Sequence, residues 1–303
     1  MNFKGRLYPL LVLLLAFPAA TSHAQDNYPS RPVRVVVPSS PGGGTDILTR
    51  RVVPSFTKEL GQNVVVDNRP GAGSIIGNDI VAHADPDGYT LLMGISTVSI
   101  LPSIRKSLPY DVLKDLAPIT QAVAAPNILL VHPSLPVHTV KALIAFARKH
   151  PGELNYASAG PGTNPHLAMA LFLNMTNLHM VHIPYKGLGP ALVDLISGQV
   201  VVTSGTMLSS LHYVQSGRLR GLATTGQKRS SALPKLPTVD EAGVKGYNVT
   251  QWYGLFAPGG TPRTIIDKLN EAMVKALESE RTKFAADGVE TVGNTPEAFR
   301  KVV

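Results

Sequence analysis

The chain has 303 residues, no cysteine and a formal net charge of +8 at pH 7, with 44% hydrophobic and 16% charged residues. This length and composition are typical of a globular protein with one large core or two smaller ones. The lack of cysteine excludes disulfides, thiolate catalysis and cysteine-based metal sites. The basic residues are scattered without interleaved aromatic residues, so we expect no nucleic-acid partner.

The N-terminal segment differs from the rest of the chain. Lys4 and Arg6 precede an apolar run over residues 7–17, and small residues follow up to Ala24. This pattern predicts a signal peptide over residues 1–24, cleaved after Ala24. No later segment approaches the roughly 20 apolar residues of a membrane-spanning helix, so we expect a soluble mature chain exported to the periplasm.

Apolar β-type runs alternate with helical patterns along the mature chain. In chain order, the predicted strands are VRVVV at 33, NVVVD at 63, YTLLMG at 89, NILLVH at 127, NYASA at 155, MVHIPY at 180, QVVVTS at 199, LRGLAT at 219 and NVTQWYGLFAP at 248. The predicted helices between them cover residues 46–60, 139–149, 165–175, 188–196 and 262–277. This alternation predicts an α/β protein with mostly parallel sheets flanked by helices.

Two strand-to-helix turns resemble each other, VVPSSPGGGTDI near residue 40 and YASAGPGTNPHLAM near residue 160. In open α/β sheets, ligands bind at such carboxyl ends of strands. Two lobes that each offer one turn across a cleft would form a clamping binding protein. We expect lobe 1 to comprise residues 25–125 and 251–303 and lobe 2 residues 126–250, with crossings at 115–133 and 246–258.

The first turn has the features of an anion site. Glycines at 42–44 allow close approach of a ligand, and hydroxyls come from Ser39, Ser40 and Thr45. The following helix adds free N–H groups and the positive end of its dipole. A nucleotide P-loop is excluded because the turn has no lysine. A plain glycine turn capped by Thr45 or Asp46 remains the alternative.

The NRPGAGSIIGND stretch at residues 68–79 places three glycines between a strand and a helix, as in dinucleotide-binding folds. The spacing is loose, and no acid ends the next strand. An exported protein also has little access to NAD. We therefore predict a helix start and no cofactor.

The second turn repeats the same chemistry with Ala159, Gly160 and Thr163. His166 falls on the first turn of the next helix, where it could face the cleft or solvent. Tyr185 follows another strand, where it could form a wall of the pocket or pack in the core. Lys186 could add positive potential there or be an ordinary solvated lysine.

Support for catalysis is weak in the sequence. No HExxH or other recognisable zinc-ligand spacing is present, and no G-x-S-x-G turn occurs, so we predict no metal site and no enzyme. An exported hydrolase or isomerase that uses Ser158 or His166 as nucleophile or base remains an alternative.

Several motifs together resemble the Bug family, the extracytoplasmic solute receptors of tripartite tricarboxylate transporters. The resemblance covers nearly the whole mature sequence, through YPSRPVRVVVP with PGGGTD, VVVDNRPGAGSIIG, ADPDGYTLLMG, ASAGPGTNPHLA, HIPYKGLGPALVDLISGQV, LPTVDEAG and WYGLFAPGGTP. It implies a two-lobe, type II-like periplasmic binding protein fold that closes on a small carboxylate. It also implies membrane transporter subunits as partners, and we expect a monomer. A sensor that presents its closed form to a membrane signalling partner remains an alternative.

The resemblance also implies how the ligand is held. Family members bind a carboxylate mainly through backbone amides and hydroxyls, without an arginine clamp. Carried over by position, and with His166 and Tyr185 added as candidate wall residues, the expected ligand contacts are Ser39, Ser40, Gly43, Gly44, Thr45, Ser96, Thr97, Ala159, Gly160, Thr163, His166 and Tyr185.

Three features depart from the family pattern. An aromatic residue is usual near Ser39, and acids are usual at the positions of Val201 and Gly205. The second acid of the family pattern could bind the amino group of an amino-acid ligand. If so, Gly205 favours a carboxylate ligand without an amine, and Gly205→Asp would restore amino-acid binding. Finally, TPEAFRKVV ends inside what the family pattern makes the last helix.

Overall fold

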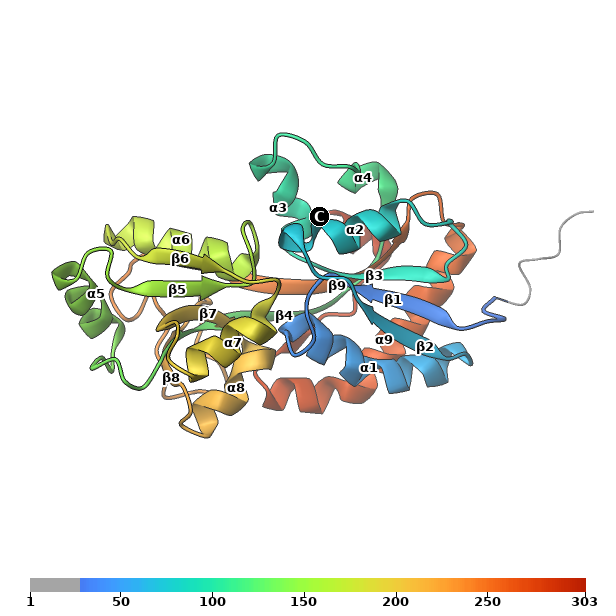
Figure 1. The fold of residues 1–303 in the computed structure, drawn as a ribbon. Helices are drawn as coiled ribbons and strands as arrows, with labels where there is room; N and C mark the ends of the chain where they lie inside the picture. Colours follow the sequence, from blue (N-terminus) through green and yellow to red (C-terminus); the bar gives the residue numbers. More distant parts are fainter. Residues whose placement is uncertain (1–27) are drawn as a thin grey trace, which may run out of the picture.

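A computed structural model describes residues 28–303, so the predicted signal peptide lies outside the described residues. Two lobes stand side by side and are joined by strands that run through both (Figure 1). The first lobe contains β1 (Val33–Val37), α1 (Gly44–Leu60), β2 (Val64–Asn68), η1 (Ala72–Ser74), α2 (Ile75–Ala82), β3 (Thr90–Ile95), α3 (Thr97–Ile104), α4 (Val112–Asp115), α9 (Arg263–Ala286), β10 (Glu290–Thr291) and α10 (Pro296–Arg300). The second lobe contains α5 (Val140–Lys149), β5 (Asn155–Ser158), α6 (Asn164–Thr176), β6 (Val181–Pro184), α7 (Leu188–Ile196), β7 (Val202–Thr206), α8 (Met207–Gln215) and β8 (Arg220–Thr224).

Alternating side chains in the first lobe enter two different cores. In β1, Val35 and Val37 pack with α1 and α9, whereas Val36 packs on the opposite face with α2 and Phe256. This is the two-residue period of a strand that is covered on both faces. Helix α9 extends nine residues beyond the predicted end because Phe284 continues the buried stripe.

The second lobe is also covered on both faces. Leu143 of α5 and Phe172 of α6 are buried on one face, and Leu192 of α7 is buried on the other. Figure 1 shows these helices gathered around β5, β6, β7 and β8. The predicted alternation of strand and helix therefore gives the same layered arrangement in each lobe.

The two crossing segments are β4 (Leu116–Val131) and β9 (Thr250–Pro258), which lie next to each other in the middle of Figure 1. The strand order is β2-β1-β3-β9-β4-β7-β5-β6, and β8 and β10 also pair with β4. The expected parallel pairing occurs among β1, β2 and β3 and among β5, β6 and β7. The crossing strands run antiparallel to their neighbours, so each lobe has a mixed sheet.

Over residues 28–303, no helix has the length and apolar character needed to cross a membrane. The parallel strands of each lobe end toward the other lobe. The turn after β1 lies against Gly187 and Gly189 of the second lobe, and the turn after β5 lies against Gly73 of the first lobe. The fold therefore places both turns singled out in the sequence at the boundary between the lobes.

Candidate ligand-binding site

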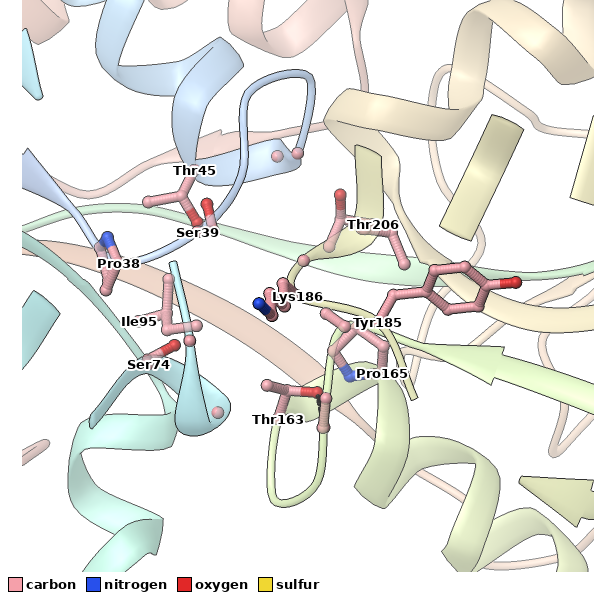
Figure 2. Close-up of a pocket in the computed structure, with 18 of the residues that line it drawn as sticks. Pro38, Ser39, Thr45, Ser74, Ile95, Thr163, Pro165, Tyr185, Lys186 and Thr206 are labelled. Atoms are coloured by element: carbon pink, nitrogen blue, oxygen red, sulfur yellow. Dashed lines mark hydrogen bonds between the residues drawn. The ribbon is translucent and has the colours of Figure 1, made fainter. Parts of the chain in front are cut away.

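A cavity of about 220 Å³ lies between the two lobes (Figure 2). Its walls come from the turns after β1, β2, β5 and β6, from the ends of β3 and β7, and from β9. The lining residues are Pro38, Ser39, Gly43, Gly44, Thr45, Gly71, Ala72, Gly73, Ser74, Ile95, Ala159, Gly160, Pro161, Thr163, Pro165, Pro184, Tyr185, Lys186, Gly187, Leu188, Thr206, Gln251 and Tyr253.

Most residues expected from the sequence are brought together at this cavity. They come from both lobes, as the clamp arrangement requires. Those that line it are Ser39, Gly43, Gly44, Thr45, Ala159, Gly160, Thr163 and Tyr185.

Three predicted residues of the first lobe do not line the cavity. Ser40 instead lies against Gly187 of the other lobe, where an added Cβ would be 2.3 Å from the Ser40 hydroxyl. Ser96 is buried and donates to Gln251 Oε1 at 2.9 Å, so it orients a lining residue. Thr97 is fully buried at the start of α3. These three residues lie outside the cavity wall, and their contact with a ligand stays a prediction.

His166 is also absent from the cavity wall, because it belongs to a cluster behind the second turn. Its ring stacks on His182 with centroids 4.4 Å apart, and Ser158 Oγ lies 2.6 Å from His182 Nε2. Burial, and then the nearby His166, lower the pKa of His182 to about 4, and burial lowers the pKa of His166. The uncharged imidazole rings of His166 and His182 therefore pack behind the turn after β5, outside the cavity wall.

Tyr185 borders the cavity, but Figure 2 shows its ring directed away from the middle of the site. The hydroxyl donates to Asp194 Oδ2 of α7 at 2.7 Å. Burial and the Asp194 carboxylate raise the pKa of Tyr185 to about 12, so the phenol stays protonated. Tyr185 thus links α7 to the end of β6. The part of the residue closest to the backbone contributes to the cavity wall.

The dominant electrostatic feature of the cavity is a convergence of helix N-termini. Five helices have their N-cap residue in the wall, and none of these caps accepts a hydrogen bond through its side chain from a backbone N–H of its helix. The helices are α1, α2, α6, α7 and α8, and their N-caps are Gly43, Ser74, Thr163, Gly187 and Thr206. First-turn N–H groups lack intrahelical partners and carry the positive end of the dipole, so the cavity suits an anion.

The hydroxyls in the wall differ in availability. Ser39 Oγ is buried without a hydrogen-bond partner, which leaves its proton free for a ligand. The Thr163 hydroxyl donates to Gly160 O at 2.6 Å, so its proton holds the turn together instead. Ser39 is therefore the better candidate donor.

Asp46 is a positioning residue for the first turn. Its buried carboxylate accepts from Gly42 N at 3.0 Å, Arg50 Nε at 2.8 Å and Asn68 Nδ2 at 3.0 Å. Asn68 also donates to Ser39 O at 3.0 Å. The acid that the sequence offered as a possible helix cap instead fixes the glycine turn to α1 and β2.

Glycines allow the two lobes to approach closely. A Cβ at Gly73 would lie 2.4 Å from Pro161 O, and one at Gly189 would lie 2.2 Å from Pro41 O. Each pair joins one lobe to the other. Glycine at these positions is therefore required for contact between the backbones across the cleft.

Several lining residues were not singled out in the sequence as ligand contacts. Residues 71–74 were interpreted as a simple helix start, yet Ala72 and Ser74 have φ of 48° and 82° and lie in the wall. The sequence feature that could have predicted this is their position after β2. This strand is parallel to β1 and ends at the same edge of the sheet. Thr206 ends β7, which is parallel to β5, so it carried the same signal, whereas Gln251 lies within the antiparallel strand β9 and had none.

The two departures after SGQV lie away from the cavity. An added Cβ at Gly205 would be 2.2 Å from Ser210 Oγ and 2.6 Å from Leu130 Cδ1, within the core. Val201 N donates to Asn155 Oδ1 at the start of β7. Restoring an acid at Gly205 would therefore strain the core, and the neighbouring Thr206 is the residue that reaches the site.

Two α/β lobes with a cavity between them define the class of two-lobe solute-binding proteins. The model of the tripartite tricarboxylate transporter family receptor, TctC, matches residues 48–298, and the chain belongs to this family. Among curated relatives, the protein BugT of Bordetella pertussis is 38% identical over 99% of this chain and 93% of its own length.

Solved structures agree with this assignment. The periplasmic binding protein BugD is 35% identical, with a TM-score of 0.88 over 91% of this chain and 94% of its own. Rpa4515 of R. palustris, solved with adipate, is 36% identical, with a TM-score of 0.88 over 91% of this chain and 93% of its own. The predicted Bug-type receptor and two-lobe α/β fold are therefore confirmed, and the family members are periplasmic binding proteins.

Proposed function

We propose that this receptor captures a small carboxylate-containing solute between its lobes and delivers it to the membrane subunits of a tripartite tricarboxylate-type transporter. The proposal places the mature chain in the periplasm as a monomer, after cleavage of the signal peptide at Ala24. Its lobes comprise residues 25–125 with 251–303, and residues 126–250. The partner change within β4 supports this division, since β4 pairs with β9 up to Pro126 and with β7 from Asn127.

The convergence of five uncapped helix N-termini carries the proposal. Such termini bind carboxylates through neutral N–H donors, and removal of water strengthens each bond. Rpa4515, a relative with the same fold, was solved with adipate, which is a carboxylate. Together these observations favour a carboxylate over a neutral solute.

The arrangement favours binding without turnover. The Ser158–His182 pair resembles a nucleophile and base, but neither residue lines the cavity, and Ser158 is fully buried. In the described residues no group of three or more His, Cys, Asp or Glu side chains forms a candidate metal site. Nothing in the cavity wall offers an activated nucleophile.

Thermal unfolding of the mature chain tests the proposal. The chain from Gln25 onward, stripped of co-purified solute, is heated with matched pairs of carboxylic acids and their neutral amides. A ligand at about 100 times its Kd adds roughly 2.7 kcal/mol of stability, which is several degrees. We expect acids to raise the midpoint and their amides to have no effect. Stabilisation by amides and not by acids would contradict the proposal.

A further inference from the structure

The first turn of α6 is fastened to both crossing strands by one buried side chain. Asn164 directly follows Thr163, the N-cap of α6 in the cavity wall. The Oδ1 atom of Asn164 accepts from Asn127 Nδ2 of β4 at 2.7 Å, and its Nδ2 atom donates to Thr250 O of β9 at 3.3 Å. The residue is 4% exposed, so its amide is shielded from competition by water.

The two groups that Asn164 contacts lie where the chain passes between the lobes. β4 pairs with β9 up to Pro126 and with β7 from Asn127, so Asn127 is the residue at which β4 changes its partner. Thr250 is the first residue of β9 and is paired with Pro126. Rotation of one lobe against the other is absorbed by a few residues of such crossing segments. Asn164 therefore contacts both segments at the expected hinge.

A network of polar side chains surrounds these crossing points. Asn127 Nδ2 also donates to Ser204 Oγ of β7 at 3.1 Å, and Asn127 N donates to Thr225 Oγ1 at 2.7 Å. The Thr225 hydroxyl in turn donates at 2.6 Å to Val249 O, directly before β9. Among these residues, Asn164 is the one that belongs to a helix whose N-cap lines the cavity. It connects the network to the cavity wall.

Folding stability alone is a weak reason for this amide pair. Asn127 is fully buried, yet its Oδ1 atom has no hydrogen-bond partner within residues 28–303. A buried acceptor that the protein leaves unpaired is unfavourable, and apolar side chains of similar shape avoid that penalty. The pair thus favours a role in the arrangement of the lobes.

We infer that Asn164 is a positioning residue that couples the first turn of α6 to the crossing strands, so that a bound solute fixes the angle between the lobes. The inference rests on the proposed function, because it requires a carboxylate at the start of α6. A carboxylate held by the first-turn N–H groups fixes the position of that turn. The Asn164 amide passes this constraint to β4 and β9. Without the amide, a solute binds the turn while the crossing strands keep their freedom.

The distance between two spin labels, measured by electron–electron resonance, tests this coupling. The chain has no cysteine, so Lys106→Cys after α3 and Lys149→Cys on α5, which replace exposed residues of the two lobes, are the only labelled sites. The probe is whichever of acetate, succinate, adipate, malate, benzoate and citrate raises the unfolding midpoint of this labelled chain most. We expect the saturating acid to shift the label distances to one narrow, shorter peak. Asn164→Ala should retain less than about half of that shift at saturation and raise Kd about three- to tenfold, because the closed arrangement is less populated.

Asn155→Ala is the matched control. The Asn155 amide also makes two hydrogen bonds, to Gln199 O at 3.1 Å and from Val201 N at 2.9 Å, but neither involves a crossing strand. We expect this variant to have a lower unfolding midpoint without acid, as Asn164→Ala does, and to keep the full shift in label distance. Asn164→Ser is a second variant that disturbs packing less. Its side chain is too short to reach both strands, so it should lose the shift as Asn164→Ala does.

A full shift and an unchanged Kd in both Asn164 variants would show a purely structural residue and overturn the inference. Loss of the shift to the same extent in Asn155→Ala would also overturn it, as would binding of the acid to the parent chain without any change in label distance. Each of these results leaves carboxylate binding intact. Failure of all six acids to bind the folded parent chain would instead overturn the proposed function. Thermal unfolding without acid confirms that each variant is folded.

Discussion

Helices that begin at the cavity differ from helices that begin elsewhere in how their first turns are satisfied. The N-caps of α4, α5 and α10 are Asp111, Thr139 and Thr295, and each accepts a hydrogen bond from its own helix. The side chains of the five N-caps in the cavity wall accept no hydrogen bond from a backbone N–H of their helices, although Thr206 Oγ1 pairs with Ser209 Oγ. Helices α3 and α9 also lack side-chain caps, so the missing cap alone does not identify a site.

The comparison shows two uses of the first-turn N–H groups of a helix. A side-chain cap uses them for folding stability, and without a cap they are available to a ligand. A side-chain cap contributes about 1 kcal/mol to folding, and a first turn without one forgoes that contribution. At the cavity, the absence of side-chain caps leaves first-turn N–H groups available to an anion. The substitutions below test whether the two sets of helix starts can be separated experimentally.

The largest effect is expected at the close approach of the lobes. Gly189→Ala places a methyl group 2.2 Å from Pro41 O across the cleft, while alanine is favoured within α7 itself. We expect ligand affinity to fall roughly five- to 150-fold, from about 1–3 kcal/mol of overpacking. Stability without ligand should stay equal or rise by up to about 1 kcal/mol. Calorimetric titration with thermal unfolding measures both, and an unchanged Kd would refute the role of Gly189 in closure.

Removal of a single cavity hydroxyl should have the next largest effect. Ser39→Ala deletes a buried hydroxyl that has no partner in the protein, so nothing is left unpaired. We expect Kd for the carboxylate to rise by about tenfold and stability without ligand to stay constant. Ser40→Ala is the control, because its hydroxyl is also buried and unpaired but lies outside the cavity. Similar affinity losses in both variants would mean that Ser39 is not a specific contact.

A cap outside the cavity should show the opposite pattern. Thr139 Oγ1 accepts from Ala142 N at 3.0 Å at the start of α5. Thr139→Ala is therefore expected to lower the unfolding free energy by about 1 kcal/mol and to leave Kd unchanged, whereas Thr139→Ser should retain stability. Urea unfolding and titration provide the measurements, and a weaker Kd in Thr139→Ala would erase the distinction between the two sets of helices.

The smallest effect concerns pH and the histidines behind the second turn. The pKa of His182 is about 4 in the folded chain, against 6.5 as its ordinary value, so the unfolded chain binds more protons between these limits. Its contribution to stability is complete above pH 6.5 and is lost as pH falls toward 4. We expect a loss on the order of 1 kcal/mol, after allowance for partial exposure.

Unfolding at pH 7 and pH 5 checks this expectation with two variants. His182→Gln should reduce the dependence of stability on pH. His138→Gln removes an exposed histidine outside the cluster and should keep the wild-type dependence. An identical dependence in the wild type and His182→Gln would show that another group controls acid sensitivity.

Local sequence patterns predicted much of the fold. Runs such as VRVVV identified the strands, and the alternation with helices predicted the α/β class. The antiparallel crossing strands were not distinguished from the others, because strand direction depends on the path of the chain and not on local composition. The end of α9 was also set too early, since Phe284 meets its core only in the folded chain.

Most of the predicted contacts in the turns after β1 and β5, where glycine and hydroxyl residues follow a strand, line the cavity, and their contact with a ligand stays a prediction. Residues whose role depends on register were less predictable. Thr206 reaches the cavity and Gly205 does not, although they are neighbours on β7, because successive strand residues face opposite sides. His166 faces His182 because of the rotation of α6 about its axis, which the packing of the second lobe determines.

The five helix starts also affect the protein before any solute arrives. Each carries roughly half an elementary positive charge, with two of them in the first lobe and three in the second. Moving the lobes together concentrates charge of one sign in a small volume, so the lobes repel each other electrostatically unless a counter-charge lies between them. An anion supplies that counter-charge and a neutral molecule does not. The termini that we propose to bind the solute thereby also oppose closure without cargo.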